Sequence, residues 1–61
     1  MFTAVYFRRT KESGTVAGFS SKEEAIRTAR NGMLLNGSDS FAIYEQGVGK
    51  PVFVFAPPKN T

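Results

Sequence analysis

The side chains that could do acid–base chemistry in this sequence are few. The chain of 61 residues contains no histidine and no cysteine, the residues most often used as a general base or a nucleophile. Its five acids fall in expected turns, in a helix cap or at a strand end: Glu12, Glu23, Glu24, Asp39 and Glu45. With so few ligands we also expect no metal site and no cofactor. The composition therefore predicts a protein that is not an enzyme.

The segment Gly47-Val48-Gly49-Lys50 has the form of the end of a phosphate-binding loop, in which backbone amides and a lysine surround a phosphate. Such a loop continues with Ser or Thr and then with a helix. Here Pro51 follows the lysine, and a strand-like run follows Pro51. The spacing therefore predicts a hairpin loop between two strands.

Aromatic and basic residues could together contact single-stranded nucleic acid, because bases stack on aromatic rings of an open sheet while basic side chains follow the backbone. Tyr6 and Tyr44, with Arg8, Arg9 and Lys11, are candidates for such a platform. Tyrosine and arginine are equally typical of protein interfaces. The net charge of only +3 favours the protein interface over nucleic acid.

One helix must lie between residues 19 and 37. Ser20 and Ser21 each stand three residues before a glutamate, Glu23 or Glu24, so either serine could begin the helix with a capping box. Apolar residues then recur at helical spacing, at Ala25, Ile26, Ala29 and Met33. The small alanines would let the helix approach a sheet closely.

The last turns of that helix are less regular. Gly32 predicts a helix that ends at Asn31 or continues loosely to Leu35, before Asn36 and Gly37 stop it. On the exposed side, Arg27 and Arg30 could contact phosphate or an acidic partner, although two arginines on a helix are ordinarily solvated charges.

Runs typical of strands flank the helix, at residues 2–9, 15–19, 41–46 and 52–56. They predict an α+β fold of ββαββ order, in which a four-stranded antiparallel sheet carries one helix on one face. We expect residues 1–57 to form a single domain and residues 58–61 to be a disordered tail. Which of the second and fourth strands lies at a sheet edge stays open.

One helix can cover only one face of such a sheet, and here both faces are apolar. If the helix covers Val5, Phe7, Phe41, Ile43, Phe53 and Phe55, the helix-free face carries Ala4, Tyr6, Ala42, Tyr44, Val52 and Val54. Reversing any strand exchanges one apolar set for another. A large uncovered apolar face marks an interface or a ligand surface.

A chain this short buries only roughly 60% of the surface that its unfolded form exposes, and without cysteine it has no disulfide to stabilise it. Association of two copies is the remaining route to stability, so we expect a homodimer. The N-terminal residues 1–9 do not have the pattern of a secretory signal, and no apolar run has the length of a membrane span. We expect a cytoplasmic protein without membrane contact.

The stretch from Gly18 to Phe55, with its serine caps, Glu-Glu-Ala-Ile and a following hairpin, resembles small uncharacterised ββαββ domains of bacterial and phage genomes. The resemblance implies the fold, and it carries no catalytic residue over to this chain. It also suggests a phage or mobile-element protein that occupies a surface on a host protein.

These observations together predict a small non-enzymatic protein-interaction module. It would self-associate through the helix-free sheet face, with Tyr6, Tyr44, Val52 and Val54 in the interface, and would present its remaining surface to a host protein. The alternative is a small single-stranded nucleic-acid-binding protein that uses the two tyrosines with Arg8, Arg9 and Lys11.

Overall fold

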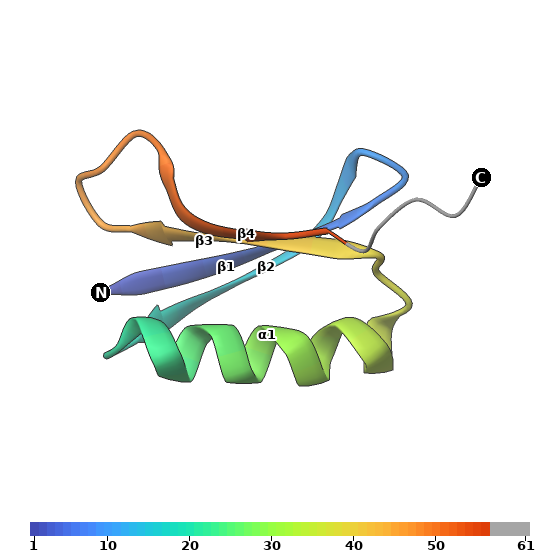
Figure 1. Cartoon of the computed structure of the whole chain (residues 1–61), viewed down its shortest axis with the longest axis horizontal. Coiled ribbons are helices and arrows are strands. Elements are labelled where there is room, and N and C mark those ends of the chain that lie inside the picture. Colours follow the sequence, from blue (N-terminus) through green and yellow to red (C-terminus); the bar gives the residue numbers. More distant parts are fainter. Residues whose placement is uncertain (57–61) are drawn as a thin grey trace.

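The computed structural model describes residues 1–56, which form one sheet with one helix lying against it (Figure 1). The elements are β1 (Phe2–Arg8), β2 (Lys11–Phe19), α1 (Lys22–Asn36), β3 (Ser40–Glu45) and β4 (Pro51–Phe55). The strands pair antiparallel in the order β2-β1-β3-β4. The predicted α+β architecture of ββαββ order is confirmed. The tail expected at residues 58–61 lies outside the described residues.

Helix α1 begins where a serine cap stands. Ser21 has an extended backbone, and its Oγ accepts a hydrogen bond from the Glu24 amide at 3.1 Å. The structure thus selects Ser21 of the two candidate serines. The helix continues through Gly32 to Asn36 and ends at Gly37, which adopts the left-handed conformation.

The β1–β2 hairpin is longer than the sequence predicted, because residues 11–14 belong to β2 and not to a loop. Its turn consists of Arg9 and Thr10, which both have positive φ, 52° and 69°. Positive φ at both central residues matches the right-handed twist of a hairpin, but the turn is usually made by Asn-Gly. Arg9-Thr10 stands here instead, so no residue pair typical of a tight turn marks this position.

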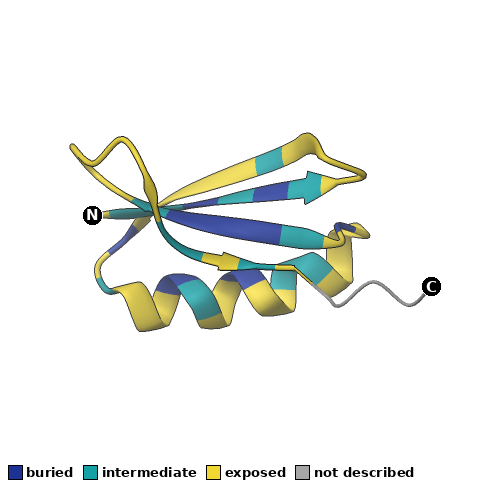
Figure 2. Cartoon of the chain, turned by 45° about the horizontal axis from the view of Figure 1, so that its top comes forward, coloured by how far each residue is buried: buried dark blue, intermediate teal, exposed yellow. Residues whose placement is uncertain are grey.

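Strand β2 also accommodates two irregularities in its pairing with β1. Phe2 pairs with Phe19 and Thr3 with Ala17, so Gly18, with φ of 96°, is left over as a bulge. A second shift follows Tyr6. Figure 2 shows that buried positions gather in β1, β3 and α1, while the edge strand β2 is exposed along most of its length.

The core lies between α1 and the middle strands. Its buried members are Ala4, Tyr6, Phe19, Ala25, Ala29, Phe41 and Ile43. Phe2, Ile26, Met33, Val52, Phe53 and Phe55 pack against them. Cross-strand pairing places Tyr6 opposite Phe41 and Ala4 opposite Ile43, so these four side chains share the face that α1 covers.

The expected orientation of β1 was therefore wrong, while β3 and the phenylalanines of β4 are oriented as expected. Ala4 and Tyr6 lie under the helix, and Val5 and Phe7 lie on the other face. The reason is steric. The ring of Tyr6 passes beneath Gly32, where an added Cβ would overlap the tyrosine hydroxyl and lie 3.0 Å from its Cζ. Small residues of α1 thus receive the tyrosine ring and leave no room for a second layer of large side chains.

Candidate interaction surface

The helix-free face carries a row of apolar side chains across the inner strands and onto β4. Val5 of β1 stands opposite Ala42 of β3, and Ala42 stands opposite Val54 of β4. Phe7 and Tyr44 lie on the same face, near opposite ends of this row, because they differ from Val5 and Ala42 by two positions. We call these five residues the open-face cluster: Val5, Phe7, Ala42, Tyr44 and Val54.

Burial within the open-face cluster is graded. Ala42 is buried, Val5, Phe7 and Tyr44 are partly buried, and Val54 is 60% exposed. No helix of the described residues lies over this face, since α1 is on the other side (Figure 1). The helix-free face therefore carries apolar side chains, but their membership differs in part from the expected one and only Val54 is largely exposed.

Two of the four predicted interface residues lie elsewhere. Tyr6 is 4% exposed and belongs to the core under α1, so it cannot line a surface on the other face. Burial raises the pKa of its hydroxyl because the charged phenolate is disfavoured away from water. Val52 is partly buried and packs against the core, next to the irregularity in the β3–β4 pairing. Tyr44 and Val54 stay as candidates.

Sequence reasoning missed Val5 and Phe7 as surface residues. A signal was available in the helix. Ala25, Ala29 and Gly32 form a small-residue seam, and such a seam favours a small partner and one flat ring beneath it. Ala4 and Tyr6 of β1 fit that description, whereas Val5 and Phe7 do not.

Both hairpin turns rise from the sheet on the side away from α1, one at each end of the helix-free face (Figure 1). The β1–β2 turn carries Arg8, Arg9 and Lys11, which are all exposed. The β3–β4 loop carries Lys50, also exposed. The face is therefore bordered by positive side chains at two separate places.

The basic β1–β2 turn is fixed to the sheet by Asp39. The Arg9 amide donates to Asp39 Oδ2 at 2.9 Å, and the Asp39 amide donates to the Phe7 carbonyl at 3.0 Å. A Ser13–Ser38 hydroxyl contact of 2.9 Å joins the same two segments. These bonds hold a turn whose φ values are uncommon for residues other than glycine.

The Gly47-Val48-Gly49-Lys50 segment is a hairpin loop, as predicted. It connects antiparallel β3 and β4, and the Val48 amide donates to the Glu45 carbonyl at 3.0 Å. The Gln46 amide donates to the Met1 carbonyl at 2.9 Å, which joins the loop to the start of β1. Strand β4 follows Lys50 directly, where a phosphate-binding loop would continue into a helix.

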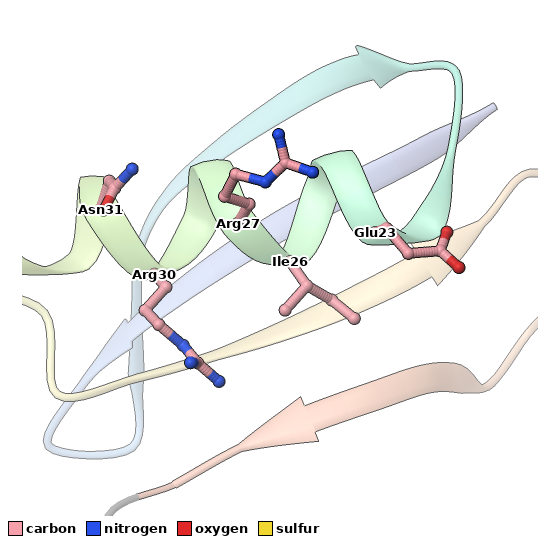
Figure 3. A pocket seen from close by; sticks show the side chains of 5 residues that line it. All are labelled: Glu23, Ile26, Arg27, Arg30 and Asn31. Atoms are coloured by element: carbon pink, nitrogen blue, oxygen red, sulfur yellow. The ribbon is translucent and has the colours of Figure 1, made fainter.

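The helix arginines do not join the basic turn. Arg27 and Arg30 project from α1 (Figure 3), and α1 lies on the opposite side of the sheet from the helix-free face (Figure 1). The Arg30 guanidinium lies over the Phe55 ring, 5.6 Å from its centroid. With Glu23, Ile26 and Asn31, the two arginines line a hollow of about 340 Å³. The sequence-predicted basic residues thus form two groups.

Within residues 1–56, no group of three or more His, Cys, Asp or Glu side chains could hold a metal ion. None of the helical structure described is long and apolar enough to cross a membrane. Comparison with protein-family models, with curated proteins and with solved structures gave no significant match.

Proposed function

We propose that this chain is a small non-enzymatic protein-interaction module that associates with a second copy of itself through the open-face cluster. The observation that carries the proposal is the apolar row Val5–Ala42–Val54 on a sheet face that no described helix covers. Val54 is 60% exposed and Val5, Phe7 and Tyr44 on the same face are partly exposed, and grouped apolar exposure of this kind marks an interface. A second copy would remove it from water.

The size of the chain supports self-association. The 61 residues contain no cysteine, and within residues 1–56 only Phe41 and Ile43 are large side chains removed entirely from solvent. Small domains of this type commonly gain stability by oligomerisation. The same association would leave α1 and the outer edges of β2 and β4 free for a further partner, such as the host protein that the family resemblance suggests.

Val54→Lys tests this interface. Val54 is 60% exposed, so a lysine can replace it without disturbing the core, but the charge would be buried in the proposed dimer. Sedimentation or light scattering over a concentration series should show a dimer for the original chain and a shift towards monomer for the variant. Leu34→Lys is the matched control, because Leu34 is 78% exposed on α1, away from this face.

Equal mass distributions for Val54→Lys and the original chain would contradict the proposed interface, as would a monomeric original chain. Tyr44→Ala is a second test, since Tyr44 remains on the face. An alanine at Tyr6 is not informative about association, because it would remove a core side chain.

A second candidate function is binding of single-stranded nucleic acid, and one observation favours it. Phe7 and Tyr44 place two aromatic rings on the helix-free face, and Arg9, Lys11 and Lys50 border that face on the two raised turns (Figure 1). Aromatic stacking with flanking positive charge is the usual basis of such binding.

Fluorescence anisotropy with a labelled oligothymidylate strand tests this alternative. Affinity should fall steeply with added salt, because phosphate contacts release counterions, and Tyr44→Ala should weaken it. Binding that is absent, or that does not change with salt, would exclude the alternative.

A further inference from the structure

We infer that the outer edge of β4, together with the side of α1 that faces it, is a docking site for an extended peptide. This site is distinct from the open-face cluster, because it lies on the helix side of the sheet. The peptide would add a strand to β4 and turn alternate side chains towards the helix side of the sheet, where the long charged side chains of α1 extend. It would carry an acidic, an apolar and a basic residue at alternate positions, in that order.

The first observation is that β4 is an open edge. It is the last strand of the sheet, and its side away from β3 has no partner strand among the described residues. Strand β4 begins with Pro51, which has no amide to donate. Its remaining run Val52-Phe53-Val54-Phe55 consists of strong strand formers without charge, so pairing with another strand is open from Val52 onwards. An edge strand of this kind binds extended peptides through main-chain hydrogen bonds, while side-chain contacts give specificity.

The other edge is a poorer template. Strand β2 is interrupted by two shifts in its register with β1, and bulges of this kind discourage pairing at an edge. It also carries the charged residues Lys11 and Glu12 near the turn. Of the two edges, β4 is therefore the one that we assign to a partner.

The second observation is that α1 leaves β4 uncovered. The helix backbone approaches β1, β3 and β2 but not β4 within the described part of the chain. Phe53 and Phe55 of β4 and Ile26 of α1 are consequently only partly buried. Figure 3 shows Ile26 and Arg30 pointing from α1 towards the β4 side. We call these four residues the β4 flank: Ile26, Arg30, Phe53 and Phe55.

The third observation is an ordered change of charge along this side of α1. Arg30, Ile26 and Glu23 follow one another along the helix as positive, apolar and negative side chains (Figure 3). Their separations along the axis are about 6 Å and about 4.5 Å, from four and three residues at about 1.5 Å each. Alternate residues of a strand are about 6.8 Å apart, which is more than either separation along the helix. The long side chains of Arg30 and Glu23 can extend along the helix axis to make up this difference.

These charges also determine the direction of the peptide. Phe55, near the end of β4, lies under Arg30, and β4 runs from the Glu23 end towards the Arg30 end (Figure 3). An antiparallel strand, which is the more stable pairing, would begin at Arg30 and end at Glu23. Its acidic residue would therefore come first, on the Arg30 side, its apolar residue would pack beside Phe53 of β4, and its basic residue would come last, on the Glu23 side.

Two capped peptides of identical composition test the inference. The first has glutamate, valine and lysine at alternate positions, separated by threonine, and the second has the glutamate and lysine exchanged. By fluorescence polarisation, the first should bind roughly three- to ten-fold more tightly, as two exposed ion pairs allow. Amide hydrogen exchange should become slower in Phe53–Phe55 when the first peptide is bound.

A charge exchange in the protein provides the specific control. Arg30→Glu should reverse the preference between the first peptide and one with lysine at both charged positions. Lys11→Glu makes the same change in net charge on the distant β1–β2 turn, and it should leave the preference unchanged. Arg30 is exposed, so its replacement should leave the fold intact, which circular dichroism checks.

Absence of binding, equal affinity for the two orientations, or unchanged hydrogen exchange in β4 would each overturn the inference. The result does not depend on the proposed dimer. Val54→Lys addresses the open-face cluster by mass in solution, whereas Arg30→Glu addresses the β4 flank by peptide preference, so failure of one proposal can be told from failure of the other.

Discussion

Gly32→Ala should destabilise this protein, although the same change in the middle of an exposed helix normally stabilises. Glycine inside a helix costs roughly 1 kcal/mol relative to alanine. At Gly32, however, the new Cβ would overlap the Tyr6 hydroxyl and lie 3.0 Å from Tyr6 Cζ. The tyrosine cannot easily turn away, because it is only 4% exposed and lies within the core.

The expected magnitude follows from these two opposing effects. Overpacking of a well-packed core costs roughly 1–3 kcal/mol, and the gain in helix propensity offsets roughly 1 kcal/mol of it. We therefore expect the free energy of unfolding to fall by about 0–2 kcal/mol. In a domain of this size, each 1 kcal/mol corresponds to a change of roughly 4–8 °C in Tm.

Urea unfolding of four proteins measures the effect: the original chain, Gly32→Ala, Tyr6→Phe and the double variant. Removal of the hydroxyl should relieve the overlap, so Gly32→Ala should be less harmful in the Tyr6→Phe background, and the cycle should show a coupling of about 1 kcal/mol. Thr28→Ala, at an exposed position of the same helix, is the control for propensity alone. If Gly32→Ala stabilises the chain by about 1 kcal/mol, the steric account of the core is wrong.

Three further predictions concern single features of the fold. Ser21→Ala should lower the free energy of unfolding by about 1 kcal/mol in urea titrations, whereas Ser20→Ala should not, because only Ser21 accepts from the Glu24 amide. Replacement of Arg9-Thr10 by Asn-Gly should raise the thermal midpoint, because both residues have positive φ; an unchanged or lower midpoint would refute the assigned turn. Burial raises the pKa of Tyr6, so with rising pH the unfolded state loses the phenolic proton before the folded state does. The free energy of unfolding should therefore be undiminished below a pH of about 10 and fall above it. Unfolding measured against pH should show a shallower decline for Tyr6→Phe.

The sequence was sufficient for the elements but not for the orientation of β1. Helix α1 could be predicted because its cap and its periodicity are local, and β3 could be predicted from its run of strand formers. The orientation of β1 could not be read from hydrophobicity, because Ala4 and Tyr6 alternate with Val5 and Phe7 and both pairs are apolar. The small residues of α1 and their contact with Tyr6 distinguish the two pairs.

The β1–β2 turn escaped prediction for a different reason. Propensity places Arg9 and Thr10 in negative φ, and the polar run that follows them is typical of a loop. Hydrogen bonds from distant residues override that preference, since Asp39 accepts from the Arg9 amide.

The membership of the open-face cluster also depended on a contact between distant residues. One helix cannot cover both faces of a four-stranded sheet, so an uncovered face could be predicted from the sequence. Which side chains of β1 lie on that face depended on the packing of Tyr6 beneath Gly32.

The close packing that fixes β1 also explains why two surfaces stay open. Strands lie about 4.8 Å apart, so four strands span about 14 Å between the axes of the outer pair, and one helix about 10 Å wide cannot cover them all. The shared core contains small side chains, Ala4, Ala25 and Ala29, which let α1 pack close to the middle strands. Strand β4 consequently lies outside the part of the sheet that α1 covers. The seam of small residues that builds the core therefore leaves the β4 flank exposed on one side of the sheet. The large side chains that the seam excludes, Val5 and Phe7, become part of the open-face cluster on the other side.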